Sequence, residues 1–160
     1  MADTIAAVAT GGSVSAIGIV RVSGDDAIAA TDAVFRAYCG IRLTDAENRR
    51  VYYGALFGAD GGLLDLCLCT VSRGPASYTG EDTVEFHCHG SPVVLSEVLH
   101  TLFSRGVRQA LPGEFTKRAF LNGRMDLTQA EAVIDLIEAE TPAAAKNAAG
   151  QLSGSIGIRL

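Results

Sequence analysis

The sequence lacks the signatures of several classes of protein. Its formal net charge is −5, whereas a domain that binds nucleic acid by itself is usually basic because phosphate contacts dominate its affinity. Tight binding of a nucleic acid by this chain alone is therefore not expected. No segment approaches about 18 consecutive apolar residues, which argues against a membrane-spanning helix. The first residues, MADT, lack the basic region of a signal peptide, so the expected location is the cytoplasm.

A disulfide framework is also missing. The four cysteines are Cys39, Cys67, Cys69 and Cys88, and their spacing is unlike that of a small secreted protein. Cys67 and Cys69 are two residues apart in an apolar run, so on a strand they face the same side. We interpret the cysteines as buried, reduced thiols of a cytosolic protein.

The chain contains no phosphate-binding loop. Such a loop requires glycine, four further residues and then Gly-Lys-Ser/Thr, so that backbone amides surround the phosphate. The Gly11-Gly12 pair is not followed by lysine and is better explained as a turn. The sequence therefore predicts neither a nucleotide site nor a catalytic residue within these 160 residues.

What is present fits a globular protein with both helices and strands. With 48% hydrophobic residues, the chain can bury roughly 70% of its unfolded surface without disulfides or metal. Strands are predicted at residues 16–22, 50–57, 63–71 and 83–89, the middle two forming a hairpin. Helices are predicted at residues 27–35, 92–105 and 114–121, from a capping box at 128–131, and from 142 onward.

These elements do not alternate strictly, which predicts an α+β fold. We expect an α+β domain at residues 1–123, followed at 124–160 by the first helices of an all-α domain. The apolar faces of the last helices find few partners before Leu160, which suggests a truncated or partial chain.

The predicted strand at residues 83–89 separates two kinds of side chain. Its apolar face carries Val84, Phe86 and Cys88, and its polar face carries Glu85, His87 and His89. A plain solvated face is one interpretation. The long loop at residues 72–82 favours a functional one, because long loops often carry binding residues.

A metal site is the alternative for the two histidines. His87 and His89 share a face, and Cys67 with Cys69 would complete four ligands only if the two pairs faced each other. The Leu-rich surroundings of the cysteines and the absence of finger-like spacing argue against this, so no metal ligand is predicted.

Two groups of basic residues attract attention. Arg21 is the only charge in the predicted strand 16–22, so it either reaches solvent or anchors an anion or carboxylate, for which arginine is well suited. Lys117, Arg118 and Arg124 would form a small basic patch.

Five stretches of the sequence form a specific combination. In chain order they are DTIAA at residues 3–7, AIGIVRVSG at 16–24, SYTGEDTVE at 77–85 with His89-Gly90 close behind, PGEFTKRAFLNGRMDL at 112–127, and QAEAV at 129–133. Their order and spacing resemble the amino-terminal region of the MnmE/TrmE family of tRNA modification GTPases over nearly the whole chain. Two loops depart from the family pattern: Thr10-Gly11-Gly12 replaces a Thr-Pro-Pro run, and Ser91 replaces a glycine.

The resemblance implies a folate-binding α+β domain related to that of glycine-cleavage aminomethyltransferases, followed by a helical domain into which a Ras-like GTPase domain is inserted. It implies a homodimer formed through the amino-terminal domain, with 5-formyltetrahydrofolate near the interface. With a flavin-dependent MnmG-type partner, such proteins install the 5-carboxymethylaminomethyl group on the wobble uridine of certain tRNAs. GTP hydrolysis, which requires potassium and magnesium, drives that cycle. The family's GTPase motifs and carboxy-terminal cysteine motif do not occur in these 160 residues.

The resemblance also implies a formyl-folate site at Arg21, Glu85 and Arg124. A pterin ring presents adjacent N–H donors on one edge, and a carboxylate can accept two of them. Glu85 is the only acid on the polar face of its strand, so we expect it to take that role. Arg21 or Arg124 would hold the tail carboxylates or the formyl oxygen.

Two rival functions remain open from the sequence. One is a stand-alone folate-dependent one-carbon transferase, since the implied fold is shared. The other is a small metal-bound structural module. The QAEAV stretch and the helices after it favour the GTPase family over both.

Overall fold

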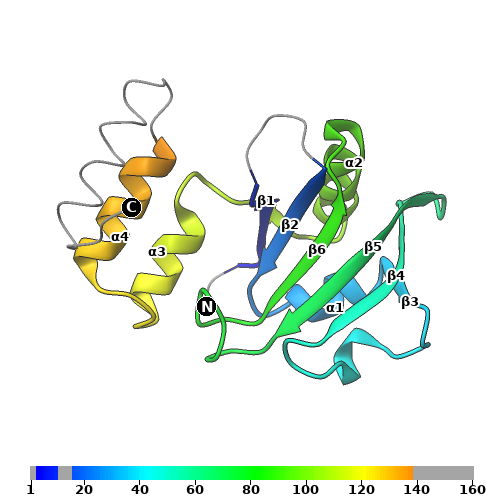
Figure 1. Ribbon diagram of the computed structural model, residues 1–160, viewed down its shortest axis with the longest axis horizontal. Coiled ribbons are helices and arrows are strands. Elements are labelled where there is room, and N and C mark those ends of the chain that lie inside the picture. The colour runs from blue at the N-terminus through cyan, green and yellow to red at the C-terminus, as the bar shows by residue number, and fades with distance from the viewer. Residues whose placement is uncertain (1–2, 11–15, 139–160) are drawn as a thin grey trace. The chain divides into compact units, whose positions relative to one another are not determined.

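The computed structural model describes residues 3–10 and 16–138, which form two compact units (Figure 1). The first unit contains the described residues up to Ser77 together with Glu81–Gln109. The second contains Tyr78–Gly80 and the described residues from Ala110 onward. None of the helices in these described ranges is long and apolar enough to cross a membrane.

The first unit is built on a seven-stranded sheet in the order β3-β4-β5-β6-β2-β1-β7. The strands are β1 (Ile5–Val8), β2 (Ile17–Ser23), β3 (Phe35–Ala37), β4 (Val51–Phe57), β5 (Leu63–Ser72), β6 (Thr83–His89) and β7 (Arg108–Gln109). Neighbouring strands are antiparallel except for β1 and β7, which are parallel. The four predicted strands and the β4–β5 hairpin are confirmed, and the mixture of helices with a sheet confirms the predicted mixed architecture.

One face of the sheet forms the hydrophobic core with two helices, α1 (Ala27–Asp32) and α2 (Pro92–Phe103). Because side chains alternate along a strand, the apolar half of β6 points into this core, where Phe86 is fully buried. Figure 1 shows both helices on the same side of the sheet. The core side chains contributed by β2, β5 and β6 are Val20, Val22, Cys67, Cys69, Val71, Val84, Phe86 and Cys88.

The cysteines are all reduced, as predicted, but they are not all buried. Cys67, Cys69 and Cys88 lie in the core, whereas Cys39 is exposed. A hydrogen bond with Cys88, together with burial, raises the pKa of the Cys67 thiol, and burial raises that of Cys69. Since the thiolate is the reactive form, these core thiols act as small apolar side chains.

The prediction of a helix over residues 27–35 is wrong at its end. α1 stops at Asp32, and Phe35 begins the edge strand β3. The Phe35 ring lies in the core, with its centroid 5.7 Å from that of Phe86. A Cβ atom on Gly54 would lie 2.3 Å from the carbonyl oxygen of Arg36, so glycine allows β3 to approach β4 this closely.

The second unit contains two described helices, α3 (Glu114–Leu121) and α4 (Leu127–Glu138). α3 has the predicted bounds. The capping box is two residues earlier than predicted: the Asp126 carboxylate accepts from the Gln129 N–H at 2.8 Å, and the Gln129 side chain accepts from the Asp126 N–H at 3.1 Å. The helix predicted from residue 142 lies outside the described residues.

The tip of the long loop belongs to this second unit. The Tyr78 hydroxyl lies 2.9 Å from the Thr116 hydroxyl, and the Asn122 amide donates to the Thr79 carbonyl at 2.8 Å. α3 therefore holds residues 78–80 in place. Arg118 is buried and lies 3.4 Å from the Glu114 carboxylate, so it does not contribute to the surface basic patch expected from the sequence.

Candidate functional site

The face of the sheet opposite α1 and α2 carries a row of polar side chains. Arg21 on β2 lies directly across from Glu85 on β6, and Thr70 on β5 follows in the same row. The Arg21 Nε donates to Glu85 Oε2 at 2.8 Å. Both side chains keep about a quarter of their surface exposed, 23% and 28%. The pair is therefore fixed by the strand register and still accessible to a ligand.

His87 flanks the same carboxylate from the next row. It lies between Ile19 on β2 and Leu68 on β5. Its Nε2 is 3.5 Å from the second carboxylate oxygen, Oε1 of Glu85. Glu85 thus has a guanidinium on one side and an imidazole on the other, with apolar side chains around the imidazole.

This arrangement can recognise a ligand with N–H donors and acceptor oxygens. A carboxylate offers about four lone-pair positions, and the Arg21 Nε donates to one of the Glu85 oxygens. The Arg21 guanidinium, which lies beside the carboxylate, is a group suited to donating N–H bonds to a ligand oxygen. The site is therefore suited to a flat polar heterocycle or an amide-like edge, held by charge-assisted hydrogen bonds.

The long loop before β6 ends beside this row. The Ser23 hydroxyl donates to the Glu81 carboxylate at 2.8 Å, and the Gly24 N–H donates to the Asp82 carbonyl at 3.0 Å. The Asp82 side chain in turn accepts from the Gly74 N–H at 2.9 Å. These bonds fix both ends of the loop and hold a second carboxylate, that of Glu81, on Ser23, two residues along β2 from Arg21.

The four-ligand metal alternative is wrong because its ligands point to opposite faces. Cys67 and Cys69 lie on the core face, whereas His87 pairs with Leu68 on the open face. His89 instead contacts Asp65, with Nδ1 2.7 Å from the carboxylate. Within residues 3–10 and 16–138, no cluster of three metal-ligating side chains occurs.

Arg124 is the predicted site residue that belongs to the second unit. It follows Gly123, whose φ is 74°, and its N–H donates to the Ala119 carbonyl at 2.7 Å. Its side chain is exposed. The role of Arg124 toward a ligand stays a prediction.

Comparison with known proteins supplies the family. A family model described as "GTP-binding protein TrmE N-terminus" matches residues 4–124. The chain belongs to the TrmE family. This confirms the resemblance drawn from the five stretches, and the match includes Arg21, Glu85 and Arg124.

Several relatives support the TrmE assignment over nearly the whole chain. A "tRNA modification GTPase MnmE" from Carboxydothermus hydrogenoformans is 51% identical over 157 residues, covering 98% of this chain. Proteins with the same name from Symbiobacterium thermophilum and Clostridioides difficile are 49% and 43% identical, covering 96% and 99% of the chain. The chain spans about a third of the length of these relatives, 34%.

Three features of this candidate site were not predicted from the sequence. Sequence reasoning assigned Arg21 and Glu85 separate ligand contacts and did not predict their ion pair, because the β2–β6 register is not visible in sequence. It placed His87 on the same polar face as Glu85 but gave it no role beside that carboxylate. Glu81 was part of a quoted stretch, but its bond to Ser23 depends on the folded loop.

Proposed function

We propose that this chain is the N-terminal module of a tRNA modification GTPase, and that it binds 5-formyltetrahydrofolate and forms a homodimer. The names of its relatives support the tRNA and GTP parts of this proposal. The whole protein, acting in the cytoplasm with an MnmG-type flavoprotein, would place the 5-carboxymethylaminomethyl group on the wobble uridine of certain tRNAs. GTP, potassium and magnesium would act in a GTPase domain outside these residues.

The Arg21–Glu85 pair on the open sheet face carries the folate part of the proposal. The donor set fits the ligand: the Glu85 carboxylate can accept the paired N–H groups of a pterin edge, and Arg21 can donate to a folate oxygen. Because the pair is only partly exposed, a bound ring would cover it and strengthen these bonds by excluding water. Arg124 would hold the formyl oxygen or the tail carboxylates.

Replacing Glu85 with glutamine is expected to weaken folate binding by about 1–3 kcal/mol, since one acceptor becomes a donor facing the pterin N–H groups. Calorimetric titration with 5-formyltetrahydrofolate measures this directly. Glu97→Gln on α2 makes the same chemical change at an exposed site outside the row and should bind like the wild type.

Equal affinities for the wild type and Glu85→Gln would remove Glu85 from the site. No binding by the wild-type protein would remove the folate site from this chain. Loss of binding in Glu97→Gln as well would point to a general loss of structure, which circular dichroism of each variant checks independently.

The open sheet face also supports the dimer. Ile17 and Leu68 are exposed there, at 57% and 42%, and apolar surface of this kind favours a two-fold partner. We expect sedimentation equilibrium at micromolar concentration to report a dimer. Leu68→Asp should shift the protein toward monomer, whereas Leu63→Asp, at another exposed leucine of the same strand, should not. A wild-type monomer would contradict the proposal.

A stand-alone one-carbon transferase is the alternative with the same folate chemistry. The coding sequence beyond residue 160 separates the two, because a tRNA modification GTPase must encode Gly-x-x-x-x-Gly-Lys-Ser/Thr there. The tRNA modification names of its relatives favour the GTPase.

A further inference from the structure

The chain segment between α1 and β4 concentrates positive charge on a protein that is acidic overall. Its arginines are Arg36, Arg42, Arg49 and Arg50, and Arg73 from the end of β5 joins them. Three acids accompany them, Asp32, Asp45 and Glu47, whereas the complete chain carries a net charge of −5. The edge of the sheet at β3 is therefore locally basic, which marks it as a contact for an anionic partner.

Arg73 fixes the backbone of this segment. Its guanidinium donates to the Ala46 carbonyl at 2.7 Å and to the Thr44 carbonyl at 2.9 Å. Arg49 is the one non-glycine residue with positive φ among the described residues, at 63°. Such a backbone conformation persists only where the surroundings enforce it, and it is concentrated at functional sites.

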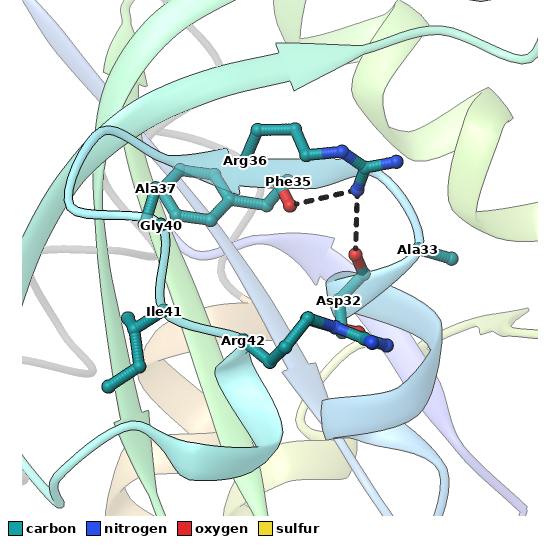
Figure 2. A pocket seen from close by; sticks show the side chains of 8 residues that line it. All are labelled: Asp32, Ala33, Phe35, Arg36, Ala37, Gly40, Ile41 and Arg42. Carbon is teal, nitrogen blue, oxygen red and sulfur yellow. Dashed lines mark hydrogen bonds and ion pairs between the residues drawn. The ribbon is translucent and has the colours of Figure 1, made fainter.

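A cavity of about 320 Å³ opens beside β3, and two of these arginines line it. Figure 2 shows the Arg36 and Arg42 side chains approaching Asp32 from different segments. The Asp32 carboxylate accepts from Arg42 Nε at 2.8 Å, whereas Arg36 contacts only the carbonyl oxygens of Asp32 and Phe35, at 3.4 and 3.3 Å. The hydrogen bonds to the Asp32 carboxylate come from Arg42, whereas Arg36 donates to backbone carbonyls, which leaves its positive charge for an anion.

An exposed aromatic pair lies at the end of β3, where Tyr38 follows the cavity-lining residue Ala37. The rings of Tyr38 and Tyr53 lie edge to face, with centroids 4.9 Å apart, and are 65% and 48% exposed. The Tyr38 N–H donates to the Tyr53 carbonyl, which continues the pairing of β3 with β4. Tyr38 directly follows β3, two residues after Arg36, so the ring and the guanidinium come from the same short stretch of this edge.

We propose that this β3 edge, defined by Arg36, Tyr38, Arg42, Arg49 and Arg50, contacts an RNA strand, with the arginines on phosphates and the Tyr38 ring stacked on a base. Guanidinium groups beside exposed aromatic rings are the combination that recognises unpaired nucleotides. An acidic protein partner would use the arginines but would not require the ring. The choice of tRNA as the source of the strand rests on the proposed function. The remainder of the chain is acidic and would repel phosphates, so the contact is confined to this edge.

The test uses the full-length protein and a labelled anticodon stem-loop RNA with uridine at the wobble position, with affinity measured by fluorescence anisotropy over a range of salt. The triple variant Arg36→Ala/Arg49→Ala/Arg50→Ala should bind roughly tenfold or more weakly. Its log–log salt slope should be smaller by about 2, as expected for three lost phosphate contacts. Arg42 is kept because it pairs with the buried Asp32, whereas the partner of Arg50, Glu47, is exposed.

Tyr38→Ala should also lose roughly tenfold in affinity, but with an unchanged salt slope, because stacking releases no counterions. Arg105→Ala, at an exposed arginine just after α2, is the matched control and should bind like the wild type. Titration of each variant with 5-formyltetrahydrofolate reports folding and the proposed function separately from RNA binding.

Wild-type affinity in both the triple variant and Tyr38→Ala would overturn the proposal, as would an equal loss in Arg105→Ala. A third outcome combines weaker RNA binding in the triple variant, wild-type binding in Tyr38→Ala, and displacement of the RNA by inorganic phosphate at constant ionic strength. That outcome would make the edge a small-anion site and would overturn the RNA contact. If RNA binding is unchanged while an MnmG-type flavoprotein binds the triple variant more weakly, the edge is a protein contact instead. If the variants lose RNA affinity as expected but the wild-type protein does not bind 5-formyltetrahydrofolate, the RNA contact is supported and the folate site is contradicted.

Discussion

Replacing Phe86 with alanine is expected to lower the free energy of unfolding by about 3–5 kcal/mol, the usual cost of deleting a buried phenylalanine ring. Phe86 is fully buried on β6, near the middle of the sheet, and its ring meets that of Phe35 at 5.7 Å. The neighbouring strands are hydrogen-bonded on both sides, so they cannot collapse far into the space. Urea unfolding followed by circular dichroism measures the change.

Two control variants test whether the loss of stability comes from the buried volume of the Phe86 ring. Phe86→Leu keeps most of the apolar volume and should lose much less stability than alanine. Leu63→Ala removes an exposed side chain, 59% accessible, and should change stability by about 0.5 kcal/mol or less. A loss below about 1 kcal/mol in Phe86→Ala would contradict the central position given to this ring.

The sequence predicted the central part of the fold because local patterns dominate there. Alternation over residues 83–89 predicted both the strand and its buried face, and the short connection between residues 57 and 63 predicted the β4–β5 hairpin. The same reasoning did not predict β1, β3 and β7, which have four, three and two residues. Strands this short form through pairing with distant segments, which no local period reveals.

The helix ends show the same limit. The segment after residue 27 has helical spacing up to Phe35, but burial of that ring in the core turns the chain into β3. At α4, two capping boxes compete within a few residues, and the structure uses Asp126 with Gln129. Local propensity is compatible with either capping box, and tertiary packing decides which one forms.

The candidate site was predicted by residue but not by geometry. Resemblance to the TrmE family selected Arg21, Glu85 and Arg124, whereas the Arg21–Glu85 bond follows from the β2–β6 register. The β3 edge carried no sequence signal that we recognised, since its arginines lie in a segment without periodicity. Their common position depends on Arg73 and on the tight approach of β3 to Gly54.

Replacing Asp32 with alanine is expected to cost about 3 kcal/mol of stability, because this buried carboxylate makes charge-assisted bonds that nothing else supplies. Its Oδ1 accepts from the buried Leu43 N–H at 2.9 Å, and its Oδ2 accepts from Arg42. Alanine leaves the Leu43 donor without its partner. Asp25→Ala, at an exposed aspartate just before α1, is the matched control and should be nearly neutral.

Asp32→Asn removes the negative charge of the side chain but keeps its shape. Comparing this variant with the wild type therefore shows how the stability contributed by the charge depends on pH. The hydrogen bond from Arg42 holds the pKa of Asp32 below its ordinary value of 3.8. A depressed carboxyl pKa adds stability that is complete above the unfolded value and is lost as the pH falls through the folded one. The stability gap between the wild type and Asp32→Asn should therefore be widest near neutral pH and should close below about pH 3.8, as urea titrations at successive pH values would show. A stability gap that stays constant into strong acid would mean that Asp32 acts through packing alone. A gap that widens there would mean that the charge of Asp32 destabilises the fold.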